Sequence, residues 1–349
     1  AEDGIRDIGV TGVQTCALPI SGTLNGKKFS LLLLLACFTL PSATASANSS
    51  AAGSDSISQQ EVADLITQLG DTNYATRESA TEQLRIIADH AIDQLLAAAD
   101  QNKDLETALR AQWILETVSL VGPDDPPEVS DLLKNFSGSS LSQQISALSR
   151  LIRLEANVGV KPLARMIRTN RSSSASYLAA LILLQEWSPI DPYWPQLVAQ
   201  VSDELGTSQR PAAVLINELI DFSLVADHLE SSFEQKQNTF NKLETALGRF
   251  LELTPFDTQT FGTNTTVRGV QDLAREIVIR CQARAAAQAG LPDRGVTVAR
   301  ELFDYIPQNS EKNMLATADV LFWAAHSGLA DLVNHLPENV QETIENQVN

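Results

Sequence analysis

The stretch NYATRESATEQLRIIADHAIDQLLAAADQNKDLETALRAQWIL, residues 73–115, determines the fold class. Ala80, Leu84 and Ile87 recur in it at the three- and four-residue spacing that places side chains on one face of a helix. The same spacing continues to either side, and short polar or Pro-rich segments separate the helical runs. No convincing alternation of apolar and polar residues marks a strand, so the sequence predicts an all-α fold.

An alanine followed four residues later by a leucine recurs along these helices. The pairs are Ala80/Leu84, Ala111/Leu115, Ala147/Leu151 and Ala180/Leu184, and successive pairs are 31, 36 and 33 residues apart. A small side chain lets two helices approach closely, and the leucine fills the space beside it on the same face. One helical hairpin buries too little apolar surface by itself, so the recurrence predicts an α-solenoid of stacked helical hairpins.

These residues resemble HEAT-like repeats. The resemblance rests on Asn73, Arg77, Ala80, Leu84, Ala91 and Leu95 in one unit, and on Asp104, Ala111 and Leu115 in the next. The second unit departs from the family by placing Ala108 where the first has Arg77. The resemblance covers residues 58–226, more weakly after residue 187, and implies a HEAT-like α-solenoid over that range. HEAT motifs imply no particular ligand.

The pattern changes towards the C-terminus, where residues 227–349 are expected to form further helical hairpins. Ala299, Phe303 and Pro307 are faintly similar to the second helix of a tetratricopeptide repeat. The alternative is that generic helical hairpins continue the same solenoid.

The N-terminal residues divide into two segments with different origins. Residues 1–20 resemble the translated read of an indexed sequencing adapter, so we expect no structural role for them. Residues 21–47 are typical of a secretory signal peptide, with Lys27 and Lys28 ahead of an apolar run and small residues before Asn48. The run has twelve residues, too few to span a hydrocarbon layer of roughly 30 Å.

Cys37 offers an alternative to cleavage near Ala47, because Leu34 to Cys37 fit a lipobox and would make Cys37 a lipidation site. Residues 48–57 are small and polar and predict a flexible tether. We therefore expect export to the periplasm or the extracellular space. An outer-membrane lipoprotein with a lipid anchor and no membrane span is the second reading.

The charge balance limits the classes of partner. Removing residues 1–47 would remove three basic and three acidic residues, which leaves the net charge at −18. An acidic surface repels phosphate groups, so nucleic acid and anionic lipids are poor partners. Of the three cysteines only Cys281 would remain, so no internal disulfide is expected and stability must come from the apolar core.

Catalytic, metal and cofactor patterns are weak along the whole chain. No two of His90, His228, His326 and His335 lie three or four residues apart, as a helix-borne zinc pair requires. Cys281 lies within a helical run, where an inert cysteine is the simpler interpretation than a nucleophile. We therefore predict no catalytic residue, no metal site and no cofactor.

Tyr193 and Trp194 are the candidate binding residues. Pro192 and Pro195 flank them at a predicted junction between helices, in a chain with only 5% aromatic residues. Aromatic anchors are enriched at interfaces, although a plug of the core between repeats is the simpler interpretation of these rings. Trp113, Trp187 and Trp323 lie in amphipathic runs and are predicted to be core residues.

Together these features predict an exported acidic α-solenoid that serves as a protein–protein interaction scaffold in the bacterial envelope. The binding role rests on the long surface that solenoids offer, and a fold does not fix a function. Two alternatives remain open. The chain could be the N-terminal part of a larger enzyme whose catalytic domain is missing, or a self-associating structural protein of the envelope.

Overall fold

The computed structural model describes residues 58–342, apart from residues 102, 187–193, 229, 254–255, 257–264, 307–309 and 339. Every regular element in these residues is a helix, and no strand occurs among them. The prediction of an all-α fold is confirmed for this part of the chain. The expected adapter segment, signal peptide, tether and lipidation site at Cys37 all lie outside the described residues.

The α-helices have the following bounds: α1 Gln59–Gln68, α2 Tyr74–Ile86, α3 Ala88–Gln101, α4 Leu105–Thr117, α5 Pro127–Leu133, α6 Leu141–Leu151, α7 Val160–Thr169, α8 Ser173–Glu186, α9 Trp194–Leu205, α10 Pro211–Asp227, α11 Phe233–Glu252, α13 Thr265–Gln288, α14 Pro292–Ala299 and α15 Ser310–His326. The 3₁₀-helices are η1 Phe136–Gly138, η2 Glu155–Asn157, η3 Arg300–Tyr305 and η4 Ala330–His335.

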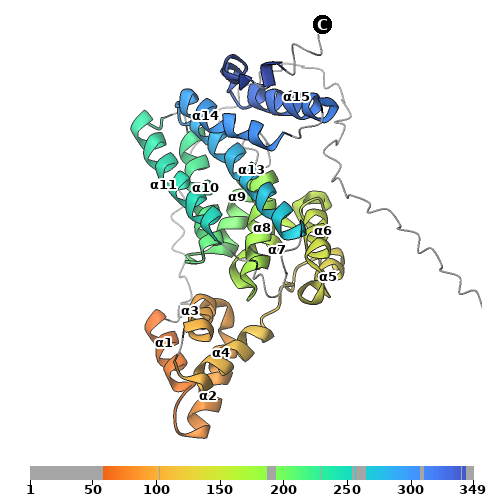
Figure 1. Cartoon of the computed structure of the whole chain (residues 1–349). Coiled ribbons are helices and arrows are strands. Elements are labelled where there is room, and N and C mark those ends of the chain that lie inside the picture. Colours follow the sequence, from red (N-terminus) through yellow and green to blue (C-terminus); the bar gives the residue numbers. More distant parts are fainter. Residues whose placement is uncertain are drawn as a thin grey trace, which may run out of the picture. The chain divides into compact units, whose positions relative to one another are not determined.

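Helices α1 to α4 pack together (Figure 1) and share one apolar core. Ala80 and Leu84 of α2 are fully buried in it, and so is Ala111 of α4 beside the nearly buried Leu115. The two alanines therefore occupy the close-packed positions that their spacing predicts. The capping box of Ser58 and Glu61 fixes the start of α1, because each side chain accepts a hydrogen bond from the backbone amide of the other residue.

A second and larger core extends from α5 to α13. Ala180 and Leu184 of α8 are buried in it, and α8 packs against α6, α7, α10 and α13. Ala147 of α6 is only partly buried at its edge, whereas its neighbour Leu148 is fully buried. The third Ala/Leu pair thus contributes its leucine, Leu151, more than its alanine to the packing.

The chain between α4 and α5 is held to α7 and α9 by the side chain of Arg165. Its Nη1 donates to Asp125 Oδ2 at 2.6 Å, and its Nη2 donates to Glu204 Oε1 at 3.1 Å. The amide of Gly122 donates to the same Asp125 oxygen at 2.7 Å. All three ionised side chains are mostly buried, so this cluster fixes the path of the connection.

A third core joins α13 and α14 to the C-terminal helices. Gly295 allows the close approach of α14 to α13, because a Cβ at this position would lie 2.7 Å from the carbonyl oxygen of Ala283. Ala299 and Phe303 are buried in this core, although residues 300–305 form a 3₁₀-helix and not a regular α-helix. None of the described helices is long and apolar enough to cross a membrane.

Candidate functional site

The binding pair predicted from the sequence is not tested by the structure. Tyr193 lies outside the described residues. Trp194 is the first residue of α9, and its side chain is not described. The prediction that Trp187 is a core residue also falls outside the described part. Trp323 is partly buried at the edge of the C-terminal core and is not one of its buried residues.

The prediction that Trp113 is a core residue is wrong. Its side chain is 51% exposed on α4, and Leu105 and Leu109 of the same helix are 70% and 52% exposed. Residues four apart advance by about 40° around a helix, so these three side chains form one continuous stripe. We call Leu105, Leu109 and Trp113 the α4 stripe.

The α4 stripe lies opposite the face that α4 turns to the core. The buried residues of α4 are Thr107, Ala111, Ile114 and Leu115. Both faces are therefore largely apolar, and apolar residues recur on each of them at the three- and four-residue spacing of a helix. The sequence pattern does not show which of the two faces is covered by another helix. The prediction that Trp113 is buried assumes that its own face is covered.

Polar contacts hold α4 in a fixed position against α2. Arg110 donates from Nη1 to Glu78 of α2 at 2.8 Å and from Nε to Glu106 at 2.6 Å. Arg77 of α2 lies 3.4 Å from the same Glu106 carboxylate. Asp104 begins the helix by accepting from the amide and hydroxyl of Thr107, and these bonds hold the pKa of Asp104 below its ordinary value. The stripe is thus carried on a rigid support.

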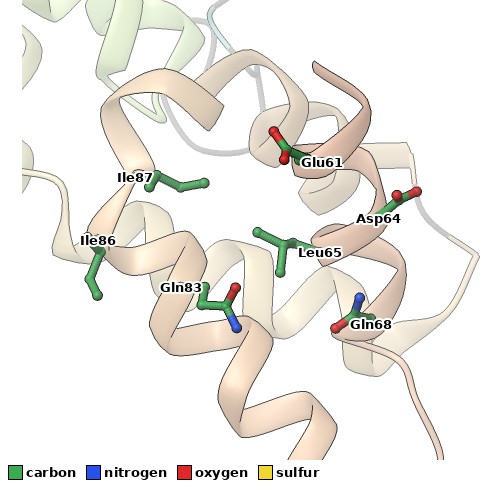
Figure 2. Close-up of a pocket in the computed structure, with 7 residues that line it drawn as sticks. All are labelled: Glu61, Asp64, Leu65, Gln68, Gln83, Ile86 and Ile87. Atoms are coloured by element: carbon green, nitrogen blue, oxygen red, sulfur yellow. The ribbon is translucent and has the colours of Figure 1, made fainter. Parts of the chain in front are cut away.

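A groove between α1 and α2 is the second candidate surface in the same group of helices. It encloses about 390 Å³ and is lined by Glu61, Asp64, Leu65, Gln68, Gln83, Ile86 and Ile87. Figure 2 shows Leu65 of α1 and Ile87 at the end of α2 pointing toward one another across it. Ile86 is 72% exposed at its edge, so the groove combines an apolar floor with an apolar rim.

The charges around this groove are almost all negative. Residues 58–101 contain eight acidic and two basic residues. Both basic residues are already paired, Arg85 with Glu82 and Arg77 with Glu106. The Ser58 amide and hydroxyl hold the pKa of Glu61 below its ordinary value, so Glu61 is ionised at neutral pH. The groove therefore attracts cationic groups.

The described residues offer little for catalysis. They contain no group of three His, Cys, Asp or Glu side chains that could hold a metal ion. Burial raises the pKa of the Cys281 thiol to about 12, which keeps it protonated and inert at neutral pH. A larger polar cavity near α3 and α10 contains Arg210, but this guanidinium donates to the carbonyls of Ile167 and Arg168 at the end of α7. Its evident role is to cap that helix.

Comparison of the chain with protein-family models, with curated proteins and with solved structures finds no match. The resemblance to HEAT-like repeats therefore remains a prediction from the sequence. The assignment of function depends on the two exposed surfaces of α1, α2 and α4.

Proposed function

We propose that the protein is an exported scaffold that binds another protein through the α4 stripe. The observation that carries the proposal is that Leu105, Leu109 and Trp113 stand more than half exposed on the face of α4 that has no covering helix in the described residues. Single exposed apolar side chains are ordinary in folded proteins, whereas a contiguous row of three is typical of an interaction surface.

The composition and support of the stripe suit a binding role. Tryptophan is the residue type most enriched among interface hot spots, and the two leucines extend its apolar contact along the helix. The ion pairs of Arg110 with Glu78 and Glu106 hold the helix that presents them. A surface that is ordered before binding loses less conformational entropy when a partner docks.

The scaffold we propose is a HEAT-like α-solenoid. In its support, the four Ala/Leu pairs fall on α2, α4, α6 and α8, each of which follows a shorter or similar helix that packs against it. This alternation is what a repeat of helical hairpins requires. Stacked hairpins leave helix faces exposed at the ends and along the surface of the array, and the α4 stripe is such a face.

Export is proposed from the sequence alone. Lys27 and Lys28, the apolar run of residues 29–40 and the small residues before Asn48 favour cleavage by signal peptidase. Expression with an initiator Met and sequencing of the mature N-terminus should locate cleavage near Asn48. Lipid incorporation that is lost in Cys37→Ser would instead establish the lipoprotein route.

The binding role is tested with two double variants of the full chain. Leu109→Ser with Trp113→Ser removes most of the α4 stripe, and Leu315→Ser with Phe322→Ser removes side chains of α15 that are 71% and 68% exposed. Both pairs should fold like the wild type, as circular dichroism and thermal unfolding would verify. A protein retained from envelope extract by the wild type and by the α15 variant, but lost with the α4 variant, is the expected partner.

The candidate partner is then purified and titrated against the same three proteins. Loss of a tryptophan hot spot together with the adjoining leucine contact should weaken binding by about a hundredfold. Equal affinity of the α4 variant and the wild type would refute the stripe as the binding surface. Loss of binding in a Tyr193→Ala, Trp194→Ala variant would then move the site to that predicted pair.

A further inference from the structure

We propose that the groove between α1 and α2 binds a cationic amphipathic segment of a polypeptide, with an apolar side chain seated in the groove and Lys or Arg facing α1. This inference rests on the proposed function only in that the partner is a polypeptide. It concerns a different surface from the α4 stripe and assigns that surface a ligand of defined chemistry.

The floor of the groove provides the apolar contact. Leu65 and Ile87 are half-buried and face one another, while Ile86 projects from the last turn of α2 with most of its side chain in solvent (Figure 2). The volume of about 390 Å³ falls within the range of sites that hold drug-sized groups. One or two large aliphatic or aromatic side chains of a helix would cover these three residues, as in other helix-in-groove complexes.

The wall formed by α1 sets the charge of the ligand. Glu61 and Asp64 are exposed and lie one helical turn apart, so together they present two carboxylates along one edge of the groove. No Lys or Arg occurs in α1 or α3, and Arg85 at the end of α2 is bonded to Glu82 through both Nε and Nη2. A cationic residue of the ligand three or four positions from its apolar anchor would face these carboxylates.

The same charges disfavour the other occupants of an apolar groove. A second copy of this chain would bring another surface of the same sign, since the chain has a net charge of −18. Anionic lipid headgroups and nucleic acid would be repelled for the same reason. A basic peptide gains attraction at long range and apolar contact once docked, which is why we commit to it.

The test uses a fluorescein-labelled helical peptide of about 14 residues, four turns, made of Leu on one face and Lys on the other. A second peptide has Glu in place of every Lys. Their affinities for the full chain are measured by fluorescence anisotropy. The variants are Ile86→Ser and Asp64→Asn, and their matched controls are Leu315→Ser on α15 and Asp131→Asn on α5, all at exposed positions.

The Lys peptide should bind and the Glu peptide should not. Ile86→Ser should raise the Kd by about tenfold and Asp64→Asn by about threefold, while both controls stay at the wild-type value. Added salt should weaken binding to the wild type more than to Asp64→Asn, because one attractive charge is missing from the variant. Hydrogen exchange on peptide binding should slow in α1 and α2.

Three outcomes would overturn the inference. The first is equal affinity for the two peptides, and the second is an equal effect of the groove variants and their controls. The third is concentration-dependent dimerisation of the peptide-free chain that Ile86→Ser abolishes, since a second copy would then occupy the groove. The proposed function fails separately, because it depends on retention of a partner by the α4 stripe and the peptide assay does not.

Discussion

Helices α4 and α8 have the same local motif but very different surroundings. Each carries an Ala/Leu pair, Ala111/Leu115 on α4 and Ala180/Leu184 on α8, and each pair is buried. Ten residues of α8 are buried, because α6, α7, α10 and α13 pack around it. Only four residues of α4 are buried, and the helices that pack against it are α1, α2 and α3.

The difference shows that the Ala/Leu pair specifies one packed face and leaves the rest of the helix undetermined. The sequence of α8 is apolar around its whole circumference, which suits a helix with neighbours on every side. The sequence of α4 is apolar on two opposite faces, and Glu106 and Arg110 lie between them on one side. The second face of α4 has no structural partner in the described residues, which makes it a candidate for recognition.

The largest expected effect is a difference in unfolding free energy between a variant of α8 and a variant of α4. Leu184→Ala should lower the free energy of unfolding by about 2–5 kcal/mol, because it removes buried methyl groups and leaves a cavity in the core beside α8. Leu109→Ala should cost less than about 1 kcal/mol, since its side chain is half in solvent. Urea unfolding of both variants measures the difference. Comparable losses would mean that the α4 stripe is covered in the native protein.

The sequence was sufficient to predict the all-α fold class of the described residues. Helices α11, α13, α14 and α15 lie within residues 227–349, where further helices are expected. Helix periodicity carries this information because a buried face must repeat about every 3.6 residues. Burial of Ala80, Ala111 and Ala180 follows from the same argument.

The candidate site could not be predicted from the sequence, and the reason is physical. Periodicity shows that Leu105, Leu109 and Trp113 share a face, but the covering of that face depends on residues far away in the chain. The groove between α1 and α2 is likewise a product of how two helices separate around Leu65 and Ile87. A useful signal was present in the charges, because α1 and α3 contain acidic residues and no Lys or Arg.

The second-largest effect concerns the ion pairs of Arg165, which hold the connection between α4 and α5 to α7 and α9. Arg165→Met should destabilise the protein by about 2–3 kcal/mol, because Asp125 and Glu204 would lose their shared cation while remaining mostly buried. The figure is below that of a fully buried pair, since the side chains of Arg165 and Glu204 keep some access to water. Thermal unfolding should show this loss at neutral pH.

A companion variant distinguishes charge from packing at Arg165. Asp125→Asn with Arg165→Met removes the charge of both partners and should recover part of the stability lost in the single variant. If the double variant is no more stable than Arg165→Met, the guanidinium acts through packing and through its bond to the carbonyl of Leu120.

The third effect lies within α4. Ala111→Leu should cost about 1–3 kcal/mol, because Ala111 is fully buried where α4 meets its neighbours and a larger side chain overpacks the core. Glu106→Gln should cost less than about 1 kcal/mol, since it weakens exposed ion pairs with Arg77 and Arg110. Melting temperatures compare the two. Equal shifts would contradict the assignment of the inner and outer faces of α4.

The smallest effect compares how the two helices begin. Asp104 caps α4 with a carboxylate, whereas Ser172 caps α8 with a hydroxyl that accepts from the amide of Ala175 at 3.3 Å. The hydrogen bonds from the Thr107 hydroxyl and amide lower the pKa of Asp104, so its ionised form is favoured in the folded state. Its contribution to stability is complete above the unfolded pKa of about 3.9 and is lost as the pH falls through the lower folded value.

Asp104→Ala should therefore destabilise the protein at pH 7, and the difference from the wild type should shrink as the pH is lowered below about 4. Ser172→Ala should also lose a cap, but its difference from the wild type should not change over the same range, because a hydroxyl does not titrate there. Urea unfolding at a series of pH values isolates each difference, since the other carboxylates are common to variant and wild type. If the stability lost in Asp104→Ala does not change with pH, the cap at Asp104 does not depend on the charge of its carboxylate.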